Sequence, residues 1–237
     1  MKFYKLIKNQ IVKEDNSNYR KYYYSQDGED VLIKAFYDGQ CGGRGGGGTY
    51  KGFYVDIGAH HPLRFSNTQI FYENGWRGIN IDATPGSMEE FRKLRPFDIN
   101  IEAGISDCYG EMEYFSFEES ALNSFCKEIS DERINNGWKL KETVKIKTYP
   151  INDILGKHLP KNQRIDFISM DIEGLELAVL GTFDFERFAP KYFLIEELNF
   201  VENDFMSYHE FPVYQLMRQK GYIVVAKTMR TVIFSLA

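Results

Sequence analysis

Several features common in secreted, membrane-spanning and nucleic-acid-binding proteins are scarce in this sequence of 237 residues. Its three cysteines, Cys41, Cys108 and Cys126, are too few and too widely spaced for a disulfide framework or a cysteine-based zinc site. No apolar run approaches membrane-spanning length. The formal net charge of -5 argues against non-specific binding to nucleic acid. We therefore expect a cytoplasmic protein with no transmembrane segment and no nucleic-acid partner.

A glycine-rich dinucleotide fingerprint is also missing, although a strand that resembles its beginning is present. The stretch GFYVDIGAHHP at residues 52–62 predicts a buried strand that ends in a sharp turn at Asp56, Gly58 and Ala59. Such a turn is typical of the ligand-binding corner of a doubly wound α/β domain, because ligands lie at the carboxyl ends of parallel strands. An ordinary core strand followed by a turn is the alternative interpretation.

The type of cofactor follows from what surrounds Gly58. The later glycines of the G-x-G-x-x-G pattern are absent, which disfavours a pyrophosphate and therefore a nicotinamide cofactor. An acidic residue before the turn suits a cationic ligand instead, and S-adenosylmethionine offers an amino group and a sulfonium. We expect the nucleoside of this cofactor to lie over residues 56–61.

The chain divides into a short leading region and one domain. Residues 1–50 predict a weak amphipathic helix at 3–12, a second helix that Ser25 caps, and a mobile connection at 39–48, where seven of ten residues are glycine. Residues 51–237 predict a single domain. Its polar segment at 118–140 is expected to be an insertion on the substrate side.

Alternating and β-branched runs predict the remaining strands, and capping residues predict the helices between them. Helices are expected after Ser66, from Ser87 with Glu90 as a capping box, and over 211–220. The strands are expected at 78–85, 99–103, 111–117, 143–148, 165–170, 192–197, 222–226 and 231–235, with the last two forming an antiparallel pair. The second of the parallel strands ends in Asp82, where an acid commonly binds ribose hydroxyls. A solvated strand end is the alternative for Asp82.

Six stretches in this order carry a family resemblance. They are SQDGED (25–30), GFYVDIGAHHP (52–62), YENGWRGINIDATP (72–85), GISD (104–107), SMDIEGLE (169–176) and IEELN (195–199). With them the sequence resembles the FkbM family of S-adenosylmethionine-dependent methyltransferases. The resemblance implies a class I, Rossmann-like α/β fold with a seven-stranded, mostly parallel sheet, helices on both faces and a C-terminal antiparallel hairpin. It also implies O-methylation of a sugar hydroxyl, on a nucleotide-activated sugar or a precursor of a surface (capsule) polysaccharide.

The resemblance also implies which residues bind the cofactor. The sequence departs from the commoner family pattern at His60, His61 and Pro62, where small polar residues and glycine are usual. The implied contacts are Asp56, Gly58 and Ala59 at the methionine end, Asp82 at the ribose, Ser106 and Asp107 beside the adenine, and Gln26 and Glu29 closing over the cofactor.

Methyl transfer to a hydroxyl needs a group that assists removal of its proton. Asp171 and Glu173 stand two residues apart, so both point to one face of an extended segment. His60 and His61 lie beside the expected cofactor and titrate near neutrality. For the histidines the alternative is a loop residue bonded to backbone, and for Glu173 it is capping of the following helix.

A metal ion is a second way to assist the hydroxyl. Asp171, Glu197 and Asn199 are predicted to end neighbouring strands and offer the oxygen ligands that Mg²⁺ or Mn²⁺ prefer. Such a cation would lower the pKa of the acceptor hydroxyl.

Two other functions stay open. They are a nicotinamide-dependent sugar-modifying enzyme and a non-catalytic binding domain that kept the fold. We also expect that the protein can form a homo-oligomer.

Overall fold

The computed structural model describes residues 22–41, 50–197 and 209–237. The predicted helix at 3–12, most of the glycine-rich connection and Asn199 lie outside these residues. None of the helices in the described ranges has both the length and the apolar character to cross a membrane.

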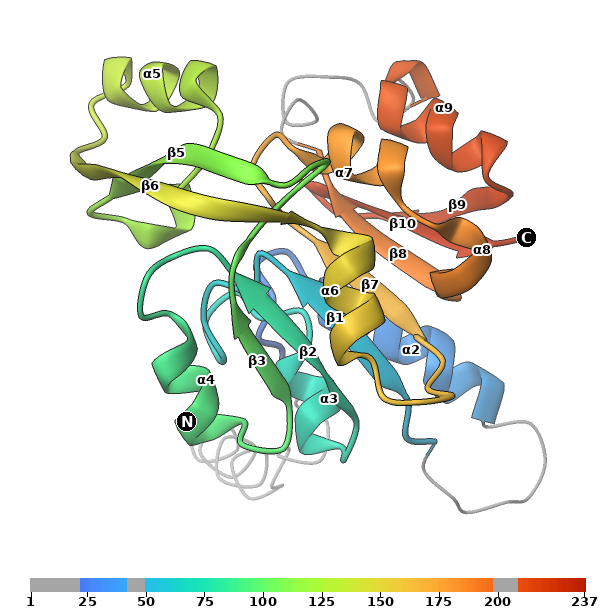
Figure 1. Ribbon diagram of the computed structural model, residues 1–237. Coiled ribbons are helices and arrows are strands. Elements are labelled where there is room, and N and C mark those ends of the chain that lie inside the picture. Colours follow the sequence, from blue (N-terminus) through green and yellow to red (C-terminus); the bar gives the residue numbers. More distant parts are fainter. Residues whose placement is uncertain (1–21, 42–49, 198–208) are drawn as a thin grey trace, which may run out of the picture.

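A seven-stranded sheet forms the centre of the molecule, with strand order β3-β2-β1-β7-β8-β10-β9 (Figure 1). The strands are β1 (Phe53–Ile57), β2 (Arg77–Asp82), β3 (Ile99–Glu102), β7 (Phe167–Met170), β8 (Tyr192–Glu196), β9 (Tyr222–Lys227) and β10 (Thr231–Leu236). Within this order, neighbouring strands pair in parallel along β3-β2-β1-β7-β8, and β10 runs antiparallel to both of its neighbours. The expected mostly parallel sheet and the C-terminal antiparallel pair are therefore confirmed.

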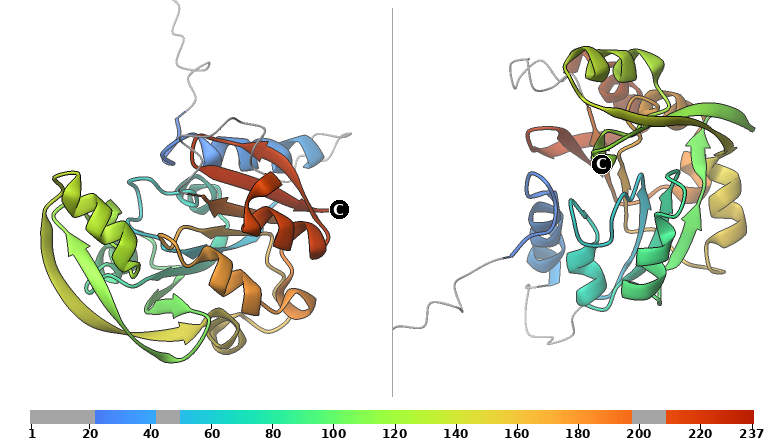
Figure 2. Two further views of the ribbon diagram at one scale, coloured as in Figure 1. Left: turned by 90° about the horizontal axis from the view of Figure 1, so that it is seen from above. Right: turned by 90° about the vertical axis from the view of Figure 1, so that its left-hand side faces the viewer.

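Helices cover both faces of this sheet (Figures 1 and 2). They are α2 (Glu29–Cys41), α3 (Gln69–Glu73) and α4 (Met88–Leu94) before the second sheet, and α6 (Ile151–His158), α7 (Glu176–Thr182), α8 (Phe185–Phe188) and α9 (Pro212–Gln219) after it. Because side chains alternate along a strand, Tyr54 packs with Ile33 and Phe71, whereas Val55 belongs to the cluster that holds Leu155 and Val179. Asp56 thus shares the face of Tyr54 and of α3.

A smaller sheet of strand order β4-β6-β5 extends from one end of the central sheet (Figures 1 and 2). Its strands are β4 (Gly104–Ser106), β5 (Gly110–Phe117) and β6 (Leu140–Pro150). The predicted insertion at 118–140 joins β5 to β6 and contains the 3-10 helix η2 (Ser120–Leu122) and helix α5 (Lys127–Asn135). The division of the chain near residue 50 stays a prediction.

One predicted helix start and one predicted capping box are wrong, although α4 does begin directly after Ser87. Helix α2 begins at Glu29 rather than directly after Ser25, because Gly28 has a left-handed φ of 91° that interrupts the helical path. Ser25 Oγ still accepts a hydrogen bond from Gly28 N at 3.1 Å. The capping box at Ser87 does not form, since Ser87 already has helical angles (φ -55°, ψ -36°) and its buried Oγ has no partner among the described residues. The N-cap residue of α3 is Thr68 rather than the predicted Ser66, although Ser66 Oγ accepts a hydrogen bond from Gln69 N, the first helical residue, at 3.1 Å.

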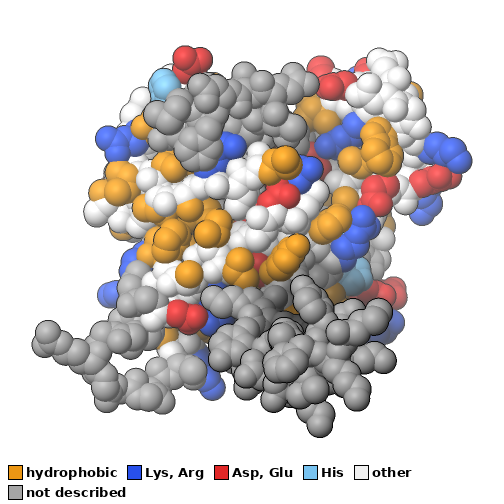
Figure 3. All heavy atoms as spheres, turned by 180° about the vertical axis from the view of Figure 1, so that it is seen from behind, with side chains coloured by type: hydrophobic (Ala, Val, Ile, Leu, Met, Phe, Trp, Pro, Cys, Tyr) orange, Lys and Arg blue, Asp and Glu red, His pale blue; other side chains and the backbone are white. Residues whose placement is uncertain are grey.

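Seen from behind, hydrophobic side chains gather in a band across the middle of the molecule, with charged side chains around it (Figure 3). Large apolar side chains left exposed include Ile223 and Val225 of the edge strand β9. Exposed apolar surface of this kind is compatible with self-association. The homo-oligomer stays a prediction.

Candidate functional site

A cavity of about 270 Å³ lies at the carboxyl ends of the parallel strands. Its walls come from the segments after β1, β2 and β7, from the end of β8, from the loop before α2, from the turn between β9 and β10, and from the insertion. Small-molecule pockets begin near this volume. The predicted residues Gln26, Glu29, Asp56 and Asp82 all line it.

Gly58 sets the shape of the turn after β1. Its φ is 80°, and a Cβ at this position would lie 1.6 Å from the carbonyl oxygen of Asp171. The amides of Gly58 and Ala59 donate to Ile81 O at 2.9 and 3.0 Å, so the turn is held against β2. Only glycine fits here, and both predicted residues line the cavity.

A buried polar network holds Asp56 in place. Its carboxylate accepts from Thr68 Oγ1 at 2.7 Å. Arg95, which is completely buried, donates to Thr68 Oγ1 at 3.0 Å, to Tyr54 Oη at 2.6 Å and to Asp98 at 2.9 Å. Burial raises the pKa of Asp56, and the Thr68 hydrogen bond and the Arg95 charge oppose this rise. The network therefore fixes the position of Asp56 and favours its charged form.

Asp82 joins two loops at the end of β2. Its two carboxylate oxygens accept from His60 N at 2.9 Å and from Thr84 N at 2.8 Å. Each oxygen can accept a further hydrogen bond, so Asp82 keeps the capacity to bind hydroxyl groups in the cavity.

The two histidines of the turn have different surroundings. His60 lines the cavity with a left-handed φ of 52°, and its Nε2 lies 3.0 Å from Ser120 Oγ of the insertion. Burial lowers the pKa of His60 and keeps it neutral. His61 does not line the cavity, because its Nδ1 accepts from the Leu63 and Arg64 amides and its Nε2 lies 2.8 Å from Glu90. Its surroundings match the backbone-bonded alternative, and nothing in its position supports catalysis.

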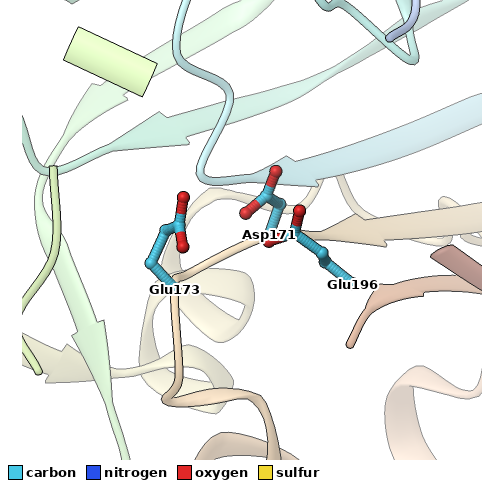
Figure 4. Close-up of side chains that lie close together, drawn as sticks. All are labelled: Asp171, Glu173 and Glu196. Carbon is cyan, nitrogen blue, oxygen red and sulfur yellow. The ribbon is translucent and has the colours of Figure 1, made fainter. Parts of the chain in front are cut away.

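Three carboxylates from the ends of β7 and β8 meet in the cavity (Figure 4). One oxygen each of Asp171, Glu173 and Glu196 lies within 4.8 Å of the others. Glu173 reaches this place through a left-handed φ of 54°, an uncommon conformation for a residue other than glycine. Its carboxylate pairs with Arg133 at 2.6 Å.

This carboxylate group binds protons more tightly than isolated acids do. Burial raises the pKa of Glu196 to about 7. Burial also raises the pKa of Asp171 well above its usual range, and the charges of Glu196 and Glu173 add to this shift. The carboxyl groups of Asp171 and Glu196 therefore influence each other's protonation. One carboxylate oxygen of Glu196, Oε2, is buried and has no hydrogen-bond partner among the described residues. The pair therefore keeps an unused acceptor in the cavity.

The predicted place of Glu197 beside Asp171 is wrong. Strand β7 pairs with β8 so that Met170 lies opposite Ile195, which puts Glu196 opposite Asp171. Glu197 lies instead in a small separate hollow with Phe211 and Val213. The second acid of the pair was visible in the sequence as IEEL, but choosing between the two acids requires the strand register.

Ser106 and Asp107 do not line the cavity. Ser106 Oγ lies 3.1 Å from Cys108 O within its own turn, and the side chain of Asp107 is exposed. Two apolar residues just before them, Ala103 and Ile105, line the cavity instead.

The loop before α2 closes the cavity on the other side. Glu29 accepts from Thr228 Oγ1 at 2.6 Å, and Asp27 pairs with Arg230 at 2.9 Å, so the loop is bound to the turn between β9 and β10. Gln26 lines the same wall. Arg230 was not predicted, and no local sequence pattern marks it.

The insertion provides the remaining wall. Arg133 of α5 donates to Leu122 O at 2.6 Å in addition to its pairing with Glu173. Ser124 Oγ donates to Glu173 O at 3.0 Å. The insertion is thus bound directly to the carboxylate group, and its place on the substrate side stays a prediction.

Comparison with known protein families matches residues 56–224 to the methyltransferase FkbM domain. The match begins near the end of β1, includes β2 to β8 and the carboxylate group, and leaves out the loop before α2 and Arg230. No curated protein matches the chain.

Proposed function

The chain belongs to the FkbM methyltransferase domain family, and on this premise we propose that it transfers the methyl group of S-adenosylmethionine to a sugar hydroxyl. The proposal includes a class I methyltransferase fold. The observation that carries it is the cavity itself, in which the fixed acids Asp56 and Asp82 share one space with the carboxylate pair Asp171 and Glu196.

The residues at the ends of β1 and β2 suit the cofactor. The glycine turn at Gly58 brings backbone to the floor of the cavity, where a side chain would collide with Asp171 O. Asp56 offers a carboxylate held in place by Thr68 to the cationic methionine end, and Asp82 offers acceptors to ribose hydroxyls. Ser106 and Asp107 are not part of this proposal, because they lie outside the lining.

The carboxylate pair suits the proton that leaves the acceptor. S-adenosylmethionine supplies an electrophilic methyl group whose transfer converts the sulfonium into a neutral thioether. Asp171 and Glu196 together hold the acceptor hydroxyl in line and take its proton as the oxygen forms its bond to carbon. A base with a pKa near the working pH is the most effective one, and burial raises the pKa of Glu196 to about 7.

A sugar fits the polar wall around this pair. Asn67, Asn123 and Ser124 line the same cavity and offer both donors and acceptors. Phe65 and Phe125 add apolar surface between them. Such a mixture of hydrogen-bonding groups and rings suits a hydroxylated ring, whether it belongs to a nucleotide-activated sugar or to a surface-polysaccharide precursor.

A divalent cation is the competing explanation for the carboxylate group. Asp171, Glu173 and Glu196 offer three oxygen ligands within 4.8 Å, as Mg²⁺ or Mn²⁺ would require. Arg133 already neutralises Glu173, however, which leaves two acids for an ion. We therefore favour the shared proton, and chelation separates the two explanations.

Ligand binding tests the proposed cofactor. Purified protein is titrated with S-adenosylhomocysteine and, separately, with NAD, while the melting temperature is followed. We expect S-adenosylhomocysteine alone to raise it. Stabilisation by NAD alone would favour the nicotinamide-dependent alternative.

Methyl transfer tests the acceptor. Radiolabelled S-adenosylmethionine is incubated with a panel of free sugars, nucleotide-activated sugars and oligosaccharides, with and without a chelator. We expect transfer to a sugar hydroxyl that the chelator leaves unchanged. Loss with the chelator and recovery with Mg²⁺ would establish the cation, and cofactor binding without any transfer would favour the non-catalytic alternative.

The remaining expectations belong to the same proposal. A cytoplasmic location agrees with the few scattered cysteines. The enzyme would meet its nucleotide-activated sugar or glycan precursor there.

A further inference from the structure

Arg230 is a fixed cation with unused hydrogen-bond donors. It lines the cavity from the turn between β9 and β10, and its side chain is 33% exposed. Its Nη1 donates to both carboxylate oxygens of Asp27, at 2.9 and 3.1 Å. No described residue accepts a hydrogen bond from its Nε or Nη2. Asp27 therefore orients the guanidinium while most of its donors stay available to a ligand.

The other arginine of the cavity is occupied. Arg133 uses Nη1 for Leu122 O and Nη2 for Glu173, and only 13% of its side chain is exposed. Of the two guanidinium groups among the described lining residues, Arg230 is therefore the one available to an oxyanion.

The charge around Arg230 limits which oxyanion can bind. Among the described residues, seven acids line the cavity against two arginines. The acids are Asp27, Glu29, Asp56, Asp82, Asp171, Glu173 and Glu196. A phosphate would face repulsion from most of them. An α-amino acid carries its own cation, so its ammonium can meet the acids while its carboxylate meets the arginine.

We propose that Arg230, oriented by Asp27, binds the carboxylate of the methionine portion of the cofactor. The inference rests on the proposed function, since it assumes that S-adenosylmethionine occupies the cavity. It adds a cofactor contact outside the residues that match the family. It also gives the loop before α2 a role, because Asp27 acts on the cofactor through Arg230.

A pair of ligands isolates this contact. S-adenosylhomocysteine carries the amino acid, and 5′-methylthioadenosine lacks it but keeps the nucleoside and the sulfur. Isothermal titration measures the dissociation constants of both for the wild type and for Arg230→Gln. We expect Arg230→Gln to weaken S-adenosylhomocysteine about 10- to 100-fold, which is the value of a charge-assisted hydrogen bond. Binding of 5′-methylthioadenosine should not change, and this also shows that the variant is folded.

Two further variants serve as controls. Asp27→Asn combined with Arg230→Gln removes one charge of each sign, so it tests whether an unmasked Asp27 causes the loss. We expect this double variant to show the same selective loss. Arg187→Gln changes an exposed arginine outside the lining and should alter neither affinity.

Other results would overturn the proposal. Unchanged S-adenosylhomocysteine affinity in Arg230→Gln would place the carboxylate elsewhere, and equal weakening of both ligands would reduce Arg230 to a structural residue. Inorganic phosphate is also titrated into protein saturated with S-adenosylhomocysteine. Phosphate binding that Arg230→Gln alone abolishes, with cofactor affinity unchanged, would assign Arg230 to an anionic acceptor. Failure of the wild type to bind either nucleoside would refute the proposed function itself.

Discussion

The two ends of the cavity hold their acids in different ways. At the ends of β1 and β2, Asp56 and Asp82 accept hydrogen bonds from Thr68 Oγ1 and from two backbone amides. At the ends of β7 and β8, Asp171 and Glu196 face each other, and Glu196 Oε2 has no partner among the described residues. The surroundings of the first pair donate hydrogen bonds to its carboxylates, whereas the second pair keeps a buried oxygen to which no described residue donates.

Under the proposed function, this difference separates cofactor binding from chemistry. Carboxylates held by hydrogen bonds keep a fixed position, which suits recognition of a ligand that carries positive charge. Carboxylates that are buried next to each other hold protons near neutral pH, which suits proton transfer. The predictions below test whether the two ends can be disturbed separately.

The largest effect is expected at Gly58, where the two ends touch. Gly58→Ala should abolish S-adenosylhomocysteine binding and lower the melting temperature strongly, because the new Cβ would lie 1.6 Å from Asp171 O. Gly86→Ala is the matched control, since Gly86 has a similar φ of 83° but nothing within 4 Å of its Cβ. The control should lose only about 1–2 kcal/mol of stability, which is the cost of a left-handed backbone at a residue other than glycine. Equal effects would show that the contact with Asp171 is unimportant.

Asp171→Asn should affect chemistry and leave binding unchanged. We expect kcat to fall about 10²- to 10⁴-fold, because the amide cannot share a proton with Glu196. The dissociation constant of S-adenosylhomocysteine should stay the same in calorimetry. Asp107→Asn, at an exposed residue outside the lining, should alter neither quantity. Full activity of Asp171→Asn would remove Asp171 from the mechanism.

Asp56→Asn should have the opposite pattern. Loss of the negative charge should weaken S-adenosylhomocysteine about tenfold or more, as expected for hydrogen bonds to a charged group. Turnover at saturating cofactor should change little. A drop in kcat without a change in affinity would contradict the assignment of Asp56 to binding.

The stability of the protein should depend on pH through Glu196. Burial raises the pKa of Glu196 to about 7 in the folded state, so folding takes up a proton between its ordinary pKa and this value. This contribution to stability is complete at low pH and is lost as the pH rises through about 7. The free energy of unfolding of the wild type, measured with urea, should therefore fall relative to that of Glu196→Gln between about pH 5 and about pH 8. Glu89→Gln, at an exposed residue, should follow the wild type, and parallel curves for Glu196→Gln would contradict a proton held by Glu196.

The smallest effect is expected where the insertion meets the turn after β1. Arg64 pairs with Glu119 at 2.8 Å, but the two side chains are 45% and 34% exposed. Arg64→Gln should therefore cost at most about 1 kcal/mol of stability. Hydrogen exchange in η2 should become faster while cofactor affinity stays unchanged. A fall in kcat as large as that expected for Asp171→Asn would make this exposed pair part of the catalytic end.

Much of the fold followed from local patterns. The buried run at residues 53–57 and its glycine turn predicted β1, and the final alternating runs predicted the antiparallel pair. These features depend on neighbouring residues, so the sequence shows them directly. The helix start at Ser25 was misjudged, because Gly28 before Glu29 changes the backbone path there. The start at Ser87 was correct, but its capping box was not, because Ser87 itself has helical angles.

The binding end of the site was predictable for the same reason. Asp56 and Asp82 each end a strand that its own residues define, and parallel strands bring their carboxyl ends together. The catalytic end was only partly predictable. Asp171 and Glu173 were named, but Glu196 was confused with Glu197, since one residue of register decides which acid faces the cavity.

The sequence by itself thus determined a doubly wound sheet with acids at the ends of its first two strands. Only the tertiary structure decided that Glu196 meets Asp171, that Arg230 reaches Asp27 across 203 positions of the chain, and that His61 turns away from the cavity. The physical reason is the range of the interactions involved. Strand propensity and turn geometry act between neighbours, whereas strand register and salt bridges between distant segments exist only after the sheet has formed.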